Sequence, residues 1–494
     1  MELVVTILVL VATLVLGWIA HRRFVEHTFL HRYGIAGPKP HLFFGNILQL
    51  KKDRVNVMTR WIKQYGKHFG YYIGGQAVIV CSDIDTLRQV LIKESTNFID
   101  RPEGPVTGEP FKSSIIYLKG EEWKRVRGAL TPSFSSAKLR LMSHIMQDCI
   151  SVFVDIIKEK AQSGTTFNMD NVAQGLTLDV ICKCALAMDT NCQRAEGGLR
   201  TNLKEFLDKA ESDVVNLAYA FPFLRLFFKI LYYIFATGGL IKLILLNLEH
   251  VIRRRRSGED SKQPDILQIM LDSQTTSGGK QMTDYHIMAN AFIYLVAGFE
   301  TSATSLSFIT QILVEKPEVQ QQILDEVTRL FPDKVSKGEK LTYEDVQELK
   351  HLDHVFNECM RIYPPVILFI SRHCLRTCTL NGYTFPGGAQ VLVPVYQLHR
   401  DPELWDAPDE FRPQRFSPDA ERPILLEQFM PFGLGPRMCI GMRFATLQIK
   451  MALVELLRNV RLKPGEGFQS PPELIVPSVI INSKNGVRVC AELI

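Results

Sequence analysis

The chain has 494 residues, of which 46% are hydrophobic, 22% charged and 10% aromatic. These fractions exclude a disordered, collagen-like or coiled-coil protein and allow a large globular fold. The net charge of +5 is too small to favour nucleic acid as a partner, and it fits a protein that works near anionic lipid or an acidic partner. The ten cysteines are scattered, without a C-x-x-C pair or zinc-site spacing, which indicates mostly reduced thiols facing the cytosol.

The amino-terminal residues 3–20 form an almost wholly apolar run, which is just long enough to cross a bilayer. A cleaved signal peptide would carry positive charge before its apolar run, whereas here only Glu2 precedes it and Arg22 and Arg23 follow. The positive-inside rule therefore predicts a retained transmembrane signal-anchor over residues 1–23, with everything after it in the cytosol.

The rest of the chain is predicted to be one mainly helical domain with small β-sheets. A linker with a stiff Gly/Pro-rich hinge covers residues 24–40, and the domain covers 41–494. Apolar periodicity predicts a long helix over 284–316 and a final helix over 442–460. The apolar and aromatic stretch 217–248 is either a buried core helix or a surface that dips into the bilayer, and the sequence leaves both open.

Three shorter features lie within the same domain. Residues 70–74 and 78–81 are typical of a small hairpin, and 390–395 of a further strand. The basic run Arg253–Arg256 is either solvated or in contact with lipid headgroups.

The tract at residues 432–441, FGLGPRMCIG, contains the cysteine most suited to chemistry. A lone cysteine is more often a buried hydrophobe than a ligand. Here Gly433 and Gly435 allow a tight loop, and Cys439 lies just before a predicted helix start, where backbone amides favour a thiolate. Arg437 adds a cation that can pair with a carboxylate.

This tract matches F-x-x-G-x-R-x-C-x-G and resembles the cytochrome P-450 superfamily, the haem-thiolate monooxygenases. The resemblance implies the P-450 fold and makes Cys439 the axial thiolate ligand of the iron in haem b, with Phe432 and Gly433 beside the cofactor. A thiolate ligand favours O–O cleavage. The sequence is most similar to the animal microsomal branch that contains the drug- and steroid-oxidising family 3. That similarity is carried by residues 121–124, 399–402 and 436–444.

Glu358 and Arg361 match the family's E-x-x-R motif. Taken alone, the two residues could form an ordinary exposed ion pair on a helix. The resemblance implies instead a buried structural triad with Arg415, which lies in a P-x-R-F stretch where Gln414 replaces the common glutamate.

Trp123 and Arg127 match W-x-x-x-R, and one helical turn places them on one side. The alternative is a core tryptophan beside a solvated arginine. The resemblance implies that both bind haem propionates together with Arg372 and Arg437, which is charge-assisted pairing. Asp100 stands where a further family arginine often lies, so that contact is not expected here.

Ala297-Gly-Phe-Glu300-Thr301 matches the family motif A-G-x-[DE]-T within the predicted long helix. A buried carboxylate is costly unless it is used. Gly298 weakens the helix and makes room for a ligand or a bulge, although a packing seam of small residues is the alternative. The resemblance implies that Glu300 and Thr301 deliver protons during oxygen activation.

The resemblance also implies an apolar substrate pocket, which favours lipophilic compounds. Its candidate residues are Ile115, Ile116, Phe221, Ala297, Ile367, Phe369 and Val479. The expected activity is insertion of one atom of O2 into a xenobiotic, steroid or fatty acid. A haem-thiolate isomerase of peroxides and a non-catalytic haem- or sterol-binding protein remain as alternatives.

The expected electron donor is NADPH-cytochrome reductase, with a cytochrome b-type protein as a second donor. The resemblance places the enzyme on the endoplasmic reticulum membrane with a single-pass anchor, a cytosolic catalytic domain and contact with membrane lipid. The reductase is acidic, so basic residues around the W-x-x-x-R helix and the Cys439 tract are expected to form its docking face. They are Lys124, Arg125, Lys138, Arg443 and Lys450.

Overall fold

The computed structural model describes residues 1–186, 188–195, 198–209, 212–234, 238–259, 265–274, 282–477 and 479–494. Residue contacts divide the chain into two compact units, and each unit is assembled from three separate segments. The first unit comprises Met1–Thr107, Ala210–Ala236 and Leu368–Gln397. The second comprises Gly108–Lys209, Thr237–Ile367 and Leu398–Ile494. Helix α18 (Val395–Leu398) lies where the chain passes from the first unit to the second.

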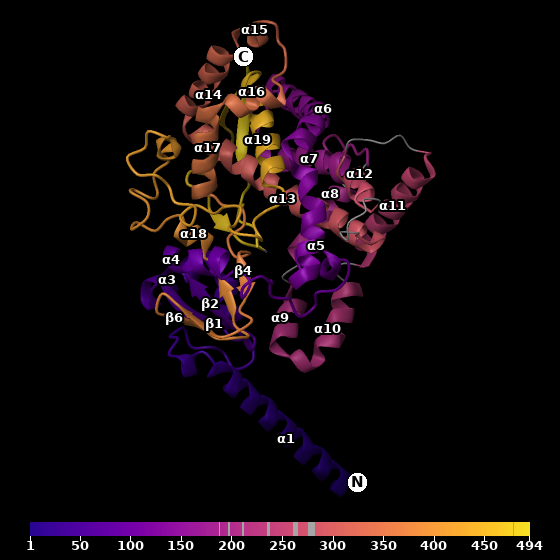
Figure 1. Cartoon of the computed structure of the whole chain (residues 1–494), viewed down its shortest axis with the longest axis vertical. Helices are drawn as coiled ribbons and strands as arrows, with labels where there is room; N and C mark the ends of the chain where they lie inside the picture. The colour runs from indigo at the N-terminus through magenta and orange to yellow at the C-terminus, as the bar shows by residue number, and fades with distance from the viewer. Residues whose placement is uncertain are drawn as a thin grey trace. The chain divides into compact units, whose positions relative to one another are not determined.

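The first unit is built around a four-stranded sheet of order β1-β2-β7-β4 (Figure 1). Strands β1 (His68–Ile73) and β2 (Gln76–Cys81) form an antiparallel hairpin, which confirms the hairpin predicted from the sequence. β7 (Gln390–Leu392) runs parallel to β2, and β4 (Ser371–His373) antiparallel to β7. A separate hairpin joins β5 (Cys378–Leu380) and β6 (Tyr383–Phe385).

Aromatic packing joins this sheet to the helices of the same unit. Trp61 lies against Phe69 and Tyr71 of β1, with ring centroids 6.3 and 5.5 Å apart. Val78 and Val80 of β2 extend the same buried cluster. The helices of the first unit are α1 (Glu2–His27), α2 (Ile47–Lys52), α3 (Arg54–Tyr65), α4 (Ile84–Arg88), α9 (Asp213–Ala220) and α10 (Arg225–Tyr232). Its shorter helices are η1 (His31–Tyr33), η2 (Gln89–Lys93) and η6 (Pro222–Leu224).

Helix α1 projects away from the sheet of its own unit (Figure 1). Two single helices among the described residues are long and apolar enough to span a membrane, α1 and α13 (Asp284–Glu315). The most apolar window of α1 is 0% buried, whereas that of α13 is 78% buried. We therefore treat α13 as a core helix and keep α1 as the candidate membrane segment.

The carboxyl end of α1 is fastened to the first unit. The Arg23 side chain, 4% exposed, donates from Nη1 to Glu26 Oε2 at 2.7 Å and from Nη2 to the Tyr219 carbonyl at 2.9 Å. Because Tyr219 lies in the last turn of α9, Arg23 caps carbonyls at that helix end. His27 Nε2 lies 2.9 Å from the Gly74 carbonyl in the β1–β2 turn.

The Gly/Pro-rich segment after α1 packs against β1. Its backbone is non-helical, as the sequence predicts, and Gly34 has a φ of +70°. The Gly70 N–H donates to the Ala36 carbonyl at 2.8 Å. A Cβ atom at Gly37 would lie 1.7 Å from the Gly70 carbonyl oxygen, so only glycine permits this approach.

The apolar stretch predicted at 217–248 divides into two different structures. In α10 only Phe228 is buried, so the buried-core alternative is wrong for that helix. The exposed apolar side chains around it are Leu226, Phe227, Ile230, Tyr233 and Ile234. In α11 (Gly238–Ser257), by contrast, Ile241, Ile244 and Leu248 are buried at helical spacing, as in a core helix. Residues 235–237 of this stretch lie outside the described residues.

The second unit is mostly helical, and α13 contacts α7, α11, α17 and α19 (Figure 1). Thr283 caps the start of α13 in a capping box with His286, and Pro317 begins the next helix, so the predicted long helix is confirmed. The other α-helices are α5 (Gly120–Leu130), α6 (Ser136–Gln162), α7 (Met169–Ile181), α8 (Leu199–Lys209), α12 (Ile266–Asp272), α14 (Pro317–Leu330), α15 (Pro332–Ser336), α16 (Tyr343–Glu348), α17 (Lys350–Ile362) and α19 (Met442–Leu457). Shorter helices are η3 (Phe111–Ser113), η4 (Thr131–Phe134), η5 (Cys182–Leu186) and η8 (Pro413–Phe416).

Two small sheets complete the second unit. One has the order β3-β11-β8, from β3 (Phe167–Asn168), β8 (Val460–Pro464) and β11 (Arg488–Leu493). The other pairs β9 (Leu474–Ile475) with β10 (Asn482–Ser483). The final helix is confirmed but ends at Leu457, because the chain must turn before it enters β8.

The basic run at the end of α11 is paired with carboxylates. Arg255 and Asp265 are 4% and 2% exposed and lie 2.5 Å apart, so this arginine is not a solvated charge. Arg256 pairs with Asp284 at the start of α13. Arg253 pairs with Glu249, and the run therefore fixes α11 rather than presenting four unpaired cations.

Candidate functional site

The loop before α19 presents the Cys439 thiol. Gly433 and Gly435 adopt φ values of +78° and +75°, a conformation that other residues rarely take. The Cys439 N–H donates to the Phe432 carbonyl at 2.8 Å, which closes the loop. All ten cysteines are described, and Cys439 alone is exposed. Cys439 is therefore the most accessible thiol of the chain, at the end of a loop that its own backbone N–H closes.

Arg437 ties the Cys439 loop to the segment before α5. Its guanidinium donates to the carbonyls of Ile115 at 3.0 Å and Leu118 at 2.6 Å. It also lies over the Trp123 ring, 4.1 Å from the centroid. The family resemblance implies that Arg437 binds a haem propionate. The contacts in the structure show that Arg437 holds the loop in place.

Trp123 and Arg127 of α5 lie beside the same loop. Arg127 Nη1 donates to the Met438 carbonyl at 3.1 Å, next to Cys439. Burial lowers the pKa of Arg127, and its interaction with Cys439 opposes this shift. The Trp123 Nε1 atom is buried and has no hydrogen-bond partner among the described residues. An unsatisfied indole donor and an arginine beside an exposed thiol form a donor set that fits the carboxylates of a haem.

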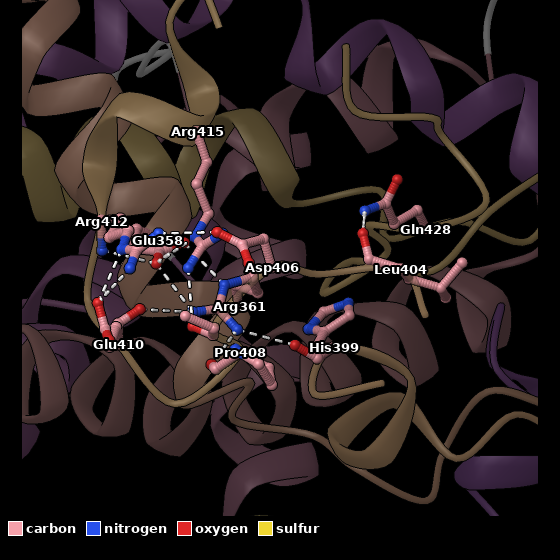
Figure 2. Close-up of polar contacts among 11 residues, drawn as sticks. Glu358, Arg361, His399, Leu404, Asp406, Pro408, Glu410, Arg412, Arg415 and Gln428 are labelled. Atoms are coloured by element: carbon pink, nitrogen blue, oxygen red, sulfur yellow. Dashed lines mark hydrogen bonds and ion pairs between the residues drawn. The ribbon is translucent and has the colours of Figure 1, made fainter. Parts of the chain in front are cut away.

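Glu358 and Arg361 of α17 form a fully buried ion pair, shown in Figure 2. Both side chains are 0% exposed, and two parallel bonds of 2.8 Å join them. The exposed-pair alternative is therefore wrong. Arg415 Nε lies 3.3 Å from Glu358 Oε1, so the structure brings together the three residues of the expected triad.

Backbone carbonyls complete the bonding of Arg361. It donates to the carbonyls of His399, Pro408 and Glu410 at 2.9, 2.7 and 3.1 Å (Figure 2). One buried guanidinium therefore organises the irregular segment before the Cys439 loop.

His399 and Phe356 link the triad to the loop, and sequence reasoning missed both. The Met430 N–H donates to His399 Nε2 at 3.1 Å, and burial lowers the pKa of His399 to about 3. His399 is therefore a neutral acceptor at physiological pH. Phe356 of α17 stacks on Phe432, with planes 12° apart.

Glu300 of α13 is buried and hydrogen-bonded. Its side chain is 3% exposed, and burial raises its pKa. Asn482 Nδ2 donates to Glu300 Oε1 at 3.3 Å. The adjacent Thr301 hydroxyl donates to the Ala297 carbonyl at 2.6 Å. Ala297 is exposed and Thr301 half-buried, so this face of an otherwise buried helix is accessible.

The family of the chain is settled by comparison with known proteins. The cytochrome P450 family model matches residues 35–490. The chain belongs to the cytochrome P450 family. Human cytochrome P450 3A5 (Homo sapiens) is 33% identical over 95% of this chain and 93% of its own length. Cytochrome P450 3A29 of Sus scrofa is 32% identical over 91% of this chain and 89% of its own length. Cytochrome P450 3A30 of Fundulus heteroclitus is 32% identical over 91% of this chain and 90% of its own length. The protein is a haem-thiolate monooxygenase with haem iron as its cofactor.

Gly298 has a packing role in this P450. The helix α13 runs without a break through this position, so the expected bulge is absent. A Cβ atom at Gly298 would lie 3.0 Å from the end of the Ile181 side chain on α7. The packing-seam alternative therefore accounts for Gly298, but it does not account for the buried carboxyl of Glu300.

The candidate pocket residues fall in both units of the P450. In the second unit Ile115 and Ile367 are buried, Ile116 and Val479 are half-buried, and Ala297 is exposed. The Ile367 N–H donates to the Val479 carbonyl at 3.4 Å, which places these two side by side.

In the first unit Phe221 lies 5.5 Å from Phe43, centroid to centroid, and Phe369 lies under the Arg101 guanidinium at 4.2 Å. Arg372, the remaining candidate for binding a propionate, also belongs to this unit. It is buried in β4 and donates to the Ser371 carbonyl at 2.9 Å.

The proposed docking cations differ in exposure. Lys124 and Arg443 are exposed, while Arg125 and Lys138 are partly exposed. Lys450, however, is 1% exposed and pairs with Asp353 at 2.7 Å, so the prediction that it meets a partner protein is wrong. The error arises because α19 is buried on nearly all sides, which its sequence pattern does not reveal.

Proposed function

We propose that this P450 inserts one atom of O2 into lipophilic small molecules, such as xenobiotics, steroids or fatty acids. The electrons come from NADPH through NADPH-cytochrome reductase, with a cytochrome b-type protein as a second donor. The observation that carries the proposal is the single exposed thiol, Cys439, beside the buried donor of Trp123 and the half-buried guanidinium of Arg127. The relatives named 3A5, 3A29 and 3A30 support the drug- and steroid-oxidising branch.

In this proposal the Cys439 thiolate would hold the iron of haem b, and Trp123, Arg127, Arg372 and Arg437 would bind its carboxylates. When bound, the haem supplies the oxygen-activating chemistry that a thiolate ligand promotes. The Phe432–Gly433 end of the loop supports the cofactor. Glu358, Arg361 and Arg415 have a structural role, because their buried network holds the segment that leads into the loop.

Glu300 and Thr301 are proposed to supply protons. Burial raises the pKa of Glu300, so the carboxyl keeps a proton to higher pH than an exposed glutamate does. The Thr301 hydroxyl can both accept and donate a hydrogen bond, and it lies on the accessible face of α13. This acid–alcohol pair favours a monooxygenase over the isomerase and the non-catalytic carrier, which need no proton supply.

The proposed substrates are lipophilic because the candidate pocket residues are apolar. They are Ile115, Ile116, Phe221, Ala297, Ile367, Phe369 and Val479.

The domain boundaries proposed from the sequence are kept, with a single-pass anchor at 1–23, a linker at 24–40 and a catalytic domain at 41–494. The exposed apolar helix α1 supports an anchor in the endoplasmic reticulum membrane, with the catalytic domain on the cytosolic face.

The deciding experiment reconstitutes the protein with reductase in lipid vesicles and screens a metabolite library for products. Oxygenated products that require NADPH support the monooxygenase. Turnover of a peroxide without NADPH would indicate the isomerase, and absence of any product would indicate a carrier.

The reduced protein with carbon monoxide is expected to show the red-shifted Soret band of thiolate ligation, and Cys439→Ser is expected to lose it. Retention of the band in that variant would mean that another residue binds iron.

A further inference from the structure

A carboxamide on β10 joins two side chains of α13. Thr304 Oγ1 lies 3.2 Å from Asn482 Oδ1, and Asn482 Nδ2 lies 3.3 Å from Glu300 Oε1. Glu300 and Thr304 are one helical turn apart and share a face of α13. Both are nearly buried, at 3% and 6% exposure, so these polar contacts lie away from bulk water.

The Thr304 hydroxyl and the Glu300 carboxylate together set the direction of the Asn482 amide. A hydroxyl can donate to the amide oxygen, and this leaves the amide nitrogen facing Glu300. The opposite orientation would place the amide oxygen against the carboxylate oxygen, which is unfavourable once Glu300 is ionised. Asn482 therefore offers Glu300 a hydrogen-bond donor of fixed orientation.

The backbone around Asn482 is held on two sides. Asn482 pairs with Ile475 in the β9–β10 sheet. The preceding Ile481 N–H donates to the Pro365 carbonyl at 2.9 Å, and Ile480 forms a β-bridge with Val366. The donor thus sits on a supported strand rather than on a free loop end.

Other charged groups act on the same carboxyl from two helices. Asp208 of α8 and Asp170 of α7 raise the pKa of Glu300, and Lys204 of α8 lowers it. Burial is the largest cause of the raised pKa, and the Asn482 hydrogen bond is the largest opposing one. A hydrogen bond to the charged form favours that form.

We propose that Asn482 is a positioning residue for proton delivery, because its amide stabilises the carboxylate that Glu300 becomes when it releases a proton. Thr304 acts through Asn482 by donating to the amide oxygen, which holds the amide nitrogen toward Glu300. The inference rests on the proposed role of Glu300 and Thr301 and adds to it the groups that make Glu300 an effective acid. Neither Asn482 nor Thr304 belongs to a motif in the sequence.

The test uses the haem-loaded full chain with reductase in vesicles, without added substrate, and measures hydrogen peroxide released per NADPH consumed across neutral pH. Asn482→Leu is expected to raise this ratio about twofold to threefold, because a weaker acid transfers its proton more slowly. The ratio should rise with pH as Glu300 loses its proton. In Asn482→Leu this rise should begin at a higher pH than in the wild type, because Glu300 without its hydrogen-bond donor keeps its proton to higher pH. Asn482→Asp keeps the shape of the side chain and the acceptor for Thr304 but adds a negative charge next to Glu300. The rise of the ratio should therefore shift to a still higher pH than in Asn482→Leu.

Matched variants separate this role from packing. Thr304→Val should act in the same direction as Asn482→Leu, and the double variant should add little to the single changes. Thr310→Val is the control, because Thr310 is buried on the same helix and, among the described residues, its hydroxyl bonds the Leu306 carbonyl alone. It should leave the ratio and its pH dependence unchanged.

Three results would contradict the proposal. A wild-type ratio and pH profile in Asn482→Leu would overturn the role of Asn482, provided that Glu300→Gln raises the ratio. If neither Asn482→Leu nor Glu300→Gln changes the ratio or its pH profile, the proposed acid role of Glu300 itself is wrong. An equal effect in Thr304→Val and Thr310→Val would assign the change to the packing of α13.

Discussion

At the scale of single residues, Glu300 and Thr301 are neighbours with different environments. Glu300 is buried and bonded by Asn482, whereas Thr301 is half-buried and bonds its own helix at Ala297. A buried acid and an accessible hydroxyl suit two steps of one proton path, with the acid as the reservoir and the hydroxyl as the contact to the reacting oxygen. Replacing each residue should therefore change a different measurement.

Thr301→Ala is expected to separate NADPH consumption from product formation. Alanine removes the hydroxyl and keeps the helix, because alanine is the better helix former. NADPH consumption should continue, hydrogen peroxide should rise, and product should fall about fivefold or more, because Thr301 is half-buried on the accessible face of α13 whereas Ser302 and Thr304 are buried. If Thr301→Ala forms as much product per NADPH as the wild type and keeps the thiolate spectrum, Thr301 has a packing role and no role in proton delivery.

Glu300→Gln is expected to change how stability depends on pH. The pKa of Glu300 is raised in the folded protein above its ordinary value of 4.5, so the folded state binds this proton more tightly than the unfolded state. The stability of the wild type should therefore fall as pH rises from about 4.5 through the folded pKa. Glutamine cannot ionise, so the melting temperature of the variant relative to the wild type should rise over that window and then level off. A constant difference at all pH values would mean that Glu300 is not buried as described.

At the scale of elements, α17 and the irregular segment around Pro408 depend on one buried pair. Glu358→Ala should leave the Arg361 charge buried without its carboxylate, and the expected loss in the free energy of unfolding is about 3–5 kcal/mol. Haem retention should fall with it, since His399 and Phe356 connect this network to the Cys439 loop.

Arg412→Ala is the matched control for this prediction. The Arg412 side chain is 42% exposed and pairs with Asp406 and Glu410, so its loss should change stability little. Its backbone N–H would still donate to Glu358. Equal loss of stability in Arg412→Ala and Glu358→Ala would show that the buried pair has no special weight.

Elements and residues that follow from local patterns were predicted well. The 3.6-residue periodicity predicted α13 nearly to its ends, and spacing within a few residues identified the Glu358–Arg361 pair. Cys439 lies exposed at the end of its loop, and its role as a ligand stays a prediction. Asn482 and His399 were missed, because each acts across a long sequence separation and no local motif marks it. Lys450 was placed wrongly because α19 is buried on nearly all sides, where Lys450 pairs with Asp353 of α17.

At the scale of the whole molecule, the proposed function has a reductase dock on the basic residues around α5 and the Cys439 loop. Lys124→Glu with Arg125→Glu should slow reduction by the reductase about tenfold at low salt, and less at high salt, because exposed charges mainly set association rate. Peroxide-driven turnover should stay nearly intact. Lys463→Glu, an exposed change on β8, is the control and should alter neither rate. Equal loss by the electron-driven and peroxide-driven routes would indicate damage to the haem site.

The fastening of α1 to the first unit has a consequence for the proposed membrane anchor. Arg23 and His27 bind the end of this helix to α9 and to the β1–β2 turn, and Gly37 packs against Gly70, so no loose tether separates the helix from the sheet. A membrane helix changes its tilt when the bilayer becomes thicker or thinner. With α1 as the anchor, each such change of tilt would move the sheet of the first unit together with α1, so lipid thickness would change the orientation of this sheet relative to the membrane surface.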